Sequence, residues 1–293
     1  MKKNVLVTGA SGFIGSHVAD DLTSLGYSVR LFDKKKSNFK NQNQKMILGD
    51  VNNLKHLYKA SKKIHTIFHF AATADLHEAN DKPFLTIENN ITGTVKLLKA
   101  SIKNKVKKII FASSIYAISE QGGIYSTSKL SSEMIIEKIC KKFNIKYVIL
   151  RFGTVYGERA NKFNTVQNFI NEGKKNLKIF RETQGNEVRR YIHVKDLAKI
   201  VIESNKKKYE NDYYNIFGNK KTLVKNLLNI IKSKIPGLKI FYSKRDKRQY
   251  NYKINPFTYK LRKGKIIKLK KYINLENGIS TLVNRKYSDE IKD

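Results

Sequence analysis

A glycine-rich turn near the amino terminus constrains the fold of this chain more than any other feature of its sequence. The apolar run Val5–Val7 leads into Gly9, Gly12 and Gly15, and residues 16–25 then carry apolar side chains at helical spacing. A strand, a G-x-x-G-x-x-G turn and a helix in this order form a dinucleotide-binding unit. Gly9 allows the tight turn, Gly12 lets the backbone approach a pyrophosphate, and Gly15 lets the helix pack closely on the strand. The predicted cofactor site also includes the intervening residues Ser11, Phe13 and Ile14.

Alternating strands and helices predict the fold class up to about residue 151. Apolar strands are expected at 27–33, 46–51, 66–72, 107–114 and 146–151, and long helices at 84–103 and 125–143. This alternation predicts an α/β fold with a doubly wound parallel sheet. From residue 152 the loops lengthen, and helices at 194–205, 222–232 and 275–284 are separated by short strands such as 213–216. We therefore expect a cofactor domain at 1–151 and a smaller α/β substrate lobe at 152–293, with an interlaced boundary.

Several strand ends supply further candidate cofactor contacts. Asp33 ends the second predicted strand, where a carboxylate meets the adenosine ribose hydroxyls, and this favours NAD. The lysines that follow it, Lys34–Lys36, offer an alternative in which a 2′-phosphate is bound, so NADP stays open. Later strand ends add Asp50, Val51, Ala71 and Ala72 to the predicted cofactor site.

Tyr125 and Lys129 form the second decisive pattern. Residues at i and i+4 lie on one face of a helix, so the lysine ammonium is expected near the phenol. An adjacent cation favours the phenolate and lowers a pKa that is ordinarily near 10. Ser114 ends the preceding strand and is predicted to hold a substrate hydroxyl while Tyr125 removes its proton. These three residues are the predicted catalytic set, and we expect no metal site.

Composition narrows the class of protein. The formal net charge is +35, but lysines occur in every segment and there is no tryptophan, so specific nucleic-acid binding is not the favoured interpretation. No apolar run reaches the length of a membrane span, and the run after Met1 is interrupted too early for a signal peptide. Cys140 is the single cysteine, which excludes an internal disulfide and makes a cytoplasmic location the expectation.

Together these motifs resemble the nucleotide-sugar branch of the NAD-dependent epimerase/dehydratase family, within the extended short-chain dehydrogenase/reductase superfamily. The resemblance covers nearly the whole chain in the family's order. The matching segments are Thr8–Gly15, His69–Ala72, Asn90–Thr94, Ser113-Ser114, the Y-x-x-x-K pair, Leu150–Gly157, Val188–Asp196 and Asp246–Tyr250.

The resemblance implies a Rossmann domain that binds NAD and a small lobe that grips a nucleotide sugar. It assigns Asn90 to a position near the cofactor site, and Arg189 and Arg248 to the substrate diphosphate, a task suited to a guanidinium fork. Thr154 stands where many epimerases have an asparagine at the diphosphate. The resemblance also implies a homodimer formed through the two long helices.

The residues after Ser114 separate the branches of this family. Sugar 4,6-dehydratases carry Asp-Glu there, whereas this chain has Ile115-Tyr116 and so lacks the acid–base pair for dehydration. The resemblance therefore implies an epimerase, acting at C4 through a 4-keto sugar in the manner of UDP-glucose 4-epimerase. Two alternatives stay open: a net NAD(P)-dependent sugar dehydrogenase or reductase, and a non-catalytic Rossmann-like module that binds RNA.

Overall fold

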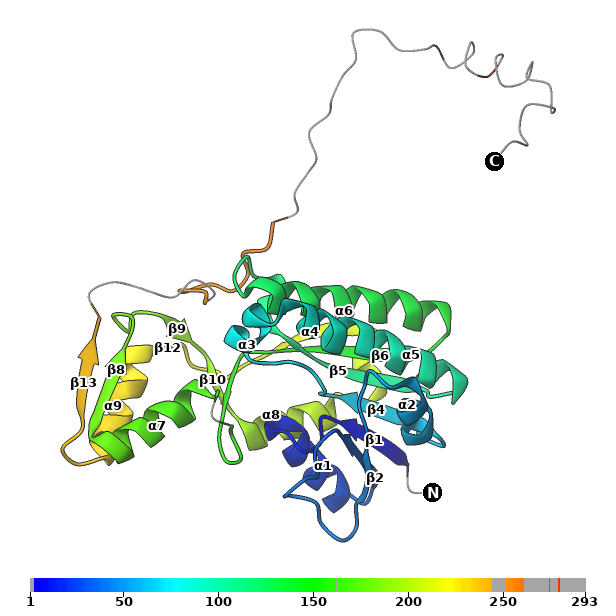
Figure 1. Ribbon diagram of the computed structural model, residues 1–293, viewed down its shortest axis with the longest axis horizontal. Coiled ribbons are helices and arrows are strands. Elements are labelled where there is room, and N and C mark those ends of the chain that lie inside the picture. Colours follow the sequence, from blue (N-terminus) through cyan, green and yellow to red (C-terminus); the bar gives the residue numbers. More distant parts are fainter. Residues whose placement is uncertain (1–2, 162, 244–250, 261–273, 275–278, 280–293) are drawn as a thin grey trace. The chain divides into compact units, whose positions relative to one another are not determined.

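The computed structural model describes residues 3–161, 163–243, 251–260, 274 and 279 (Figure 1). Residues Met1–Tyr259 form one compact unit and Lys260–Asp293 a second. Two sequence-based expectations, Arg248 and nearly all of the helix at 275–284, lie outside the described residues. No helix in the described part of the chain combines the length and apolar character needed to span a bilayer.

A seven-stranded sheet forms the centre of the first unit, in the order β11-β6-β5-β4-β1-β2-β3. Every neighbouring pair in it is parallel. The strands are β1 (Asn4–Thr8), β2 (Ser28–Asp33), β3 (Lys45–Leu48), β4 (Thr66–His69), β5 (Lys108–Ser114), β6 (Lys146–Phe152) and β11 (Asp212–Ile216). The strand order reverses between β1 and β4, and in open parallel sheets ligands bind outside the carboxyl ends of the strands at such a reversal. The predicted α/β fold class is confirmed.

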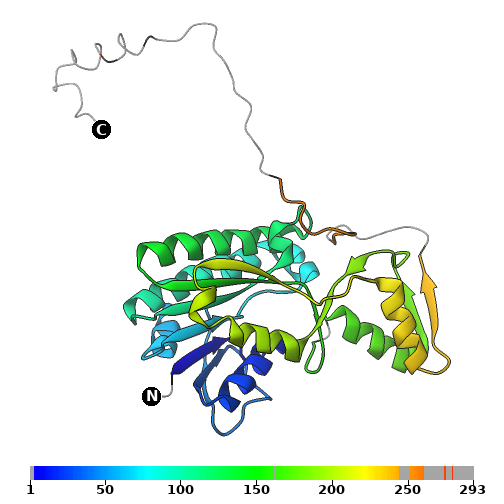
Figure 2. The ribbon, with the colours of Figure 1, turned by 180° about the vertical axis from the view of Figure 1, so that it is seen from behind.

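Helices cover both faces of this sheet because its strand residues are apolar on both sides. Val5 and Val7 point to the face covered by α1 (Phe13–Ser24) and α8 (Val194–Glu203), where they join one core cluster. Leu6, between them, points to the opposite face and joins a second cluster with side chains of α2 (Leu54–Ser61) and α5 (Gly93–Lys103). Figures 1 and 2 show these two helical layers, with α6 (Gly123–Lys142) beside α5.

The long helix expected at 84–103 is interrupted. It begins as α4 (Pro83–Ile87), continues through a π-helical turn at Glu88–Thr92 and ends as α5. A short helix before it, α3 (Leu76–Asp81), was not expected from the sequence.

Two glycines with positive φ, Gly122 (98°) and Gly123 (57°), make the tight path from β5 into α6 possible.

Residues after 152 contribute to two separate cores. In the smaller one, α7 (Thr165–Asn176) and α9 (Val224–Lys234) pack on the parallel pair β8 (Lys178–Arg181) and β13 (Lys239–Tyr242). By contrast, α8 and β11 return to the main sheet, so the strand expected at 213–216 forms its edge. The remaining strands are β7 (Thr154–Tyr156), β9 (Val188–Arg189), β10 (Tyr191–His193) and β12 (Thr222–Leu223). Two elements of the predicted substrate lobe, α8 and β11, therefore pack with the main sheet. The division into two lobes at 151/152 stays a prediction.

Candidate active site

A cleft of about 640 Å³ lies at the carboxyl ends of the central strands. It brings together most of the residues that the sequence singles out, from segments spread over more than a hundred positions. They are Gly9, Gly12, Phe13, Ile14, Gly15, Asp33, Lys34, Lys35, Asp50, Val51, Ala71, Ala72, Ser114, Tyr125 and Lys129.

The glycine turn has no room for side chains. Gly9 has a φ of +67°, and a Cβ there would lie 2.7 Å from the backbone nitrogen of Ala71 in the loop after β4. A Cβ on Gly15 would lie 2.3 Å from the carbonyl oxygen of Gly9. The bare backbone and the start of α1 therefore form a cradle that fits the pyrophosphate of a dinucleotide.

Asp33 closes the adenosine side of the cleft. Its carboxylate accepts hydrogen bonds from the backbone N–H groups of Ser11 (3.0 Å) and Lys35 (3.1 Å), which hold it beside the glycine turn. The Ser11 hydroxyl donates to the carbonyl of Lys35, and Ser11 itself is not among the residues that line the cleft. A carboxylate in this place suits the two free hydroxyls of an NAD ribose and repels a 2′-phosphate.

The three predicted catalytic residues meet at the other end of the cleft. Tyr125 lies near the start of α6, and its phenol interacts with the side chain of Ser114, at the end of β5. Burial raises the pKa of the Tyr125 phenol to about 12, and the Ser114 hydrogen bond opposes that rise. From the sequence, Lys129 is expected to lower the pKa of Tyr125. In the structure this pKa is raised instead, because the phenol is removed from water.

Lys129 is held rigidly behind the tyrosine. Its Nζ donates to the carbonyl of Ala112 at 2.9 Å and lies over the ring of Phe111. Burial lowers the pKa of Lys129 to about 8, and the charge of Glu133 acts to raise it. At neutral pH most Lys129 side chains are thus still protonated, and a positive charge is present next to the cleft.

Two buried polar groups support the floor of the site. His69 bonds to the hydroxyls of Thr8 (2.7 Å) and Thr94 (3.2 Å), and burial lowers its pKa to about 3, so the imidazole is neutral. Asn90 accepts a hydrogen bond from the backbone N–H of Thr73 and donates to its carbonyl. Asn90 does not line the cleft itself; it holds the backbone of Thr73, which does.

Of the predicted diphosphate contacts, the two that the structure describes, Thr154 and Arg189, do not line the cleft. Thr154 lies in β7 between Gly153 and Val155, which line the cleft, but it does not line the cleft itself. Arg189 is 8% exposed; its guanidinium stacks on the ring of Tyr252 at 4.1 Å and donates to the carbonyls of Val188 and Lys253. The roles of Thr154 and Arg189 therefore stay predictions.

Sequence reasoning missed the loops that form the walls of the cleft. Asp75 and Asn164 both line it, and each caps a helix by accepting a backbone N–H through its side chain, at Glu78 and Gln167 respectively. Asp and Asn are favoured at helix N-caps, so this signal was present in the sequence. Other missed lining residues are Phe70, Thr73, Ala74, Glu78, Leu85, Asn89, Phe152, Gly153, Val155, Asn161 and Phe163.

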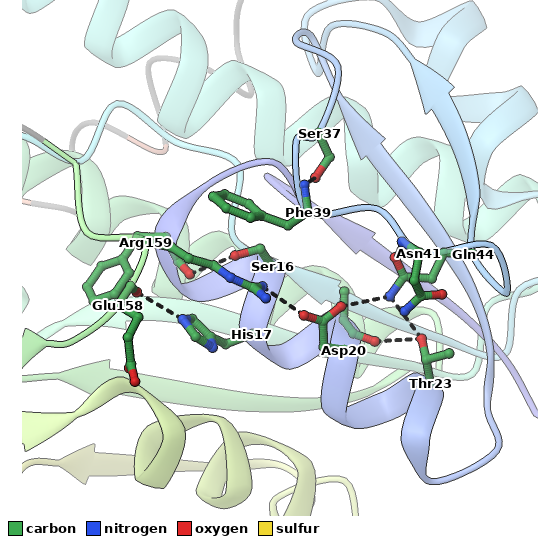
Figure 3. A network of polar contacts seen from close by, with 12 residues as sticks. Ser16, His17, Asp20, Thr23, Ser37, Phe39, Asn41, Gln44, Glu158 and Arg159 are labelled. Carbon is green, nitrogen blue, oxygen red and sulfur yellow. Dashed lines mark hydrogen bonds and ion pairs between the residues drawn. The ribbon is translucent and has the colours of Figure 1, made fainter.

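A polar network ties one of these walls to the cofactor side of the fold (Figure 3). Arg159 follows β7; it forms an ion pair with Asp20 of α1 at 2.7 Å and stacks on the ring of Phe39. The neighbouring carbonyl of Glu158 accepts a hydrogen bond from His17, also on α1. Because α1 begins at the glycine turn, this network joins the segment containing Asn161 to the pyrophosphate cradle.

We expect Arg159→Ala to weaken NAD binding about fivefold, because one partly buried ion pair and one cation–π contact would be lost from the wall. Titration of intrinsic fluorescence with NAD measures the effect. Lys195→Ala is the matched control. Like Arg159, Lys195 forms an ion pair, but its partner is Glu158 and both side chains are exposed to solvent. Loss of this pair should therefore change the affinity for NAD less than twofold. Equal losses in both variants would show that the Arg159 contacts are not specific.

Residues 5–216 match the NAD dependent epimerase/dehydratase family. The chain belongs to this family. The match spans the glycine turn, the Ser114–Tyr125–Lys129 set and all seven strands of the main sheet. The cofactor of the family is NAD, in agreement with the cradle at the glycine turn and the carboxylate of Asp33.

The similarity to individual relatives covers most of this chain and most of each relative. A putative UDP-glucose 4-epimerase of Methanocaldococcus jannaschii is 29% identical over 96% of this chain and 97% of its own. The crystal structure of Thermotoga maritima UDP-glucose 4-epimerase with UDP-glucose superposes with a TM-score of 0.79, at 28% identity, over 86% of this chain and 88% of that one. A Methanobrevibacter ruminantium UDP-N-acetylglucosamine 4-epimerase, in complex with UDP-N-acetylmuramic acid, gives 0.78 at 28% identity over 87% and 89%.

Proposed function

We propose that this protein is an NAD-dependent nucleotide-sugar epimerase that inverts the hydroxyl at C4. The observation that carries the proposal is the meeting of Ser114, Tyr125 and Lys129 with a dinucleotide cradle in one cleft. Support also comes from the relatives, which include 4-epimerases of UDP-glucose and of UDP-N-acetylglucosamine.

The side chains of the cleft supply the proton chemistry. The cradle at Gly9, Gly12 and Gly15 would hold NAD, which would supply the hydride acceptor and donor for C4 of the sugar. Tyr125, as the phenolate, takes the proton of the C4 hydroxyl onto its oxygen and later gives it back, so the cycle uses no net proton. Ser114 holds the same hydroxyl through its side chain. We assign to Lys129, which lines the same cleft, the task of favouring the phenolate through its positive charge.

The assembly we propose is a homodimer paired through α4, α5 and α6. Several large apolar side chains on these helices face solvent in the single chain, with Phe84 85% exposed and Met134 56% exposed. Ile87 of α4 is also exposed, whereas the exposed Leu85 lines the active-site cleft. Large apolar side chains that face solvent are a feature of protein–protein interfaces.

Incubation with a panel of UDP-, GDP- and dTDP-sugars tests the proposed function. We expect an isomeric sugar nucleotide, detected by chromatography with mass spectrometry, and no net gain in absorbance at the NADH wavelength. Stoichiometric NADH would instead identify a net dehydrogenase. No product with any sugar, together with RNA binding that survives moderate salt, would favour the non-catalytic alternative.

A further inference from the structure

A second hollow lies at the opposite end of the sheet from the active-site cleft. It has a volume of about 680 Å³ and is lined by residues that precede or begin the parallel strands, where Figure 1 marks the amino terminus. The last turn of α8 and the residues after it complete the wall. We call this hollow the amino-edge groove; its lining residues are Lys3, Leu25, Tyr27, His65, Lys107, Lys108, Lys146, Ile202, Glu203, Asn205, Lys206, Lys207 and Glu210.

Positive charge dominates the lining of the amino-edge groove. Six lysines face it against two glutamates, and both glutamates are already engaged. Glu210 forms an ion pair with the buried Lys108, and Glu203 pairs with Lys206. Among the described residues, no carboxylate lies within ion-pair distance of the four other lysines, Lys3, Lys107, Lys146 and Lys207. A concave surface with uncompensated charge of one sign concentrates the field and attracts anions.

His65 lines the groove, and its pKa is affected by the neighbouring lysine charges. The pKa of its imidazole is lowered by partial removal from water, and further by the charges of Lys3, Lys108 and Lys107. The charges of three lysines therefore act together on His65. This convergence distinguishes the lysines of the groove from those scattered over other surfaces. No acidic group is among the causes of this shift.

The groove also has an apolar part. Leu25, Tyr27 and Ile202 line it together with the lysines. Tyr27 and Ile202 are half-buried and pack against the core cluster under α1 and α8, so this surface is firmly held. A volume of this size is within the range of small-molecule sites, and an apolar surface next to lysines suits a ligand with a planar base and phosphates.

We propose that the amino-edge groove is a second binding site, separate from the active-site cleft, for a nucleoside polyphosphate whose phosphates contact Lys107 and Lys146. The base lies against Tyr27 and Ile202. Because none of its residues lines the active-site cleft, the proposal stands independently of the proposed function.

The imidazole of His65 supplies a local readout. Its NMR signal, assigned by its loss in His65→Gln, is followed during titration with ATP and, separately, with inorganic tripolyphosphate. We expect ATP to raise the pKa of His65, because the phosphates offset the lysine charges, and to bind at least about threefold more tightly than tripolyphosphate because of the apolar surface. No change at His65 with ATP would overturn the proposal, and equal affinity for the two anions would overturn the nucleotide assignment.

A pair of charge-matched variants separates the groove from the general charge of the protein. Lys107→Gln/Lys146→Gln should weaken ATP binding at His65 about tenfold. Lys174→Gln/Lys175→Gln, at the end of α7, removes the same charge away from the groove and should change it less than twofold. Equal weakening in both variants would show that the net charge of +35, and not the groove, attracts the anion.

Discussion

Tyr125→Phe should lower kcat for C4 epimerisation by about 10²–10⁴-fold, the usual contribution of a positioned acid–base group. The substitution removes only the phenol oxygen, and the Tyr125 ring is buried, 8% exposed, at the start of α6. Packing is thus preserved, and both NAD affinity and the melting temperature should stay close to those of the unmodified protein. Initial rates with the preferred sugar, with cofactor content measured on the same samples, test this.

Tyr116→Phe is a demanding control for this prediction. Tyr116 lies beside Tyr125 with ring centroids 6.5 Å apart, and it is likewise removed from water. Its hydroxyl donates to Asn251 instead of bonding with Ser114. Loss of that single hydrogen bond should cost less than about tenfold in rate. A Tyr125→Phe protein that keeps more than a tenth of the activity, or a Tyr116→Phe protein that loses as much, would refute the assignment of Tyr125 as the base.

Local patterns predicted the parts of the site that a few neighbouring residues determine. Backbone sterics explain why the turn at Gly9–Gly15 needs glycine. The helix repeat explains why Tyr125 and Lys129, four residues apart, lie on the same face of α6. Because parallel strands end at one edge of a sheet, Asp33 and Ser114 were also expected near the same cleft. The three glycines of the turn line this cleft in the structure, together with Asp33, Ser114, Tyr125 and Lys129.

Long-range packing determined what the sequence did not show. The spacing of Tyr125 and Lys129 gives no measure of burial, and burial reverses the expected direction of the tyrosine pKa. Arg189, whose assignment to a substrate diphosphate stays a prediction, packs on Tyr252, a contact between residues 63 positions apart that no local pattern encodes. Likewise Asn161 lines the cleft two residues after Arg159, whose ion pair with Asp20 joins residues far apart in the sequence.

The buried ion pair behind the catalytic residues leads to the largest expected effect on stability. Glu133, fully buried in α6, accepts hydrogen bonds from the guanidinium of Arg151 (2.6 Å to Nη2) on β6 and from the hydroxyl of Ser113 on β5. Glu133→Ala would leave the Arg151 charge, with only 15% of its side chain exposed, without a partner. We expect a loss of about 3–5 kcal/mol in the free energy of unfolding, measured by urea titration.

Removing both charges distinguishes the ion pair from simple loss of volume. In Glu133→Met/Arg151→Met the Arg151 charge is removed together with its partner, so most of the stability lost in Glu133→Ala should return. Lys82→Ala breaks an exposed pair with Glu78 and should cost less than about 1 kcal/mol, which calibrates the measurement. If the double variant is as unstable as Glu133→Ala, the cost comes from packing. If Glu133→Ala itself loses less than about 1 kcal/mol, the pair contributes little to holding α6, and hence Tyr125 and Lys129, against the ends of β5 and β6.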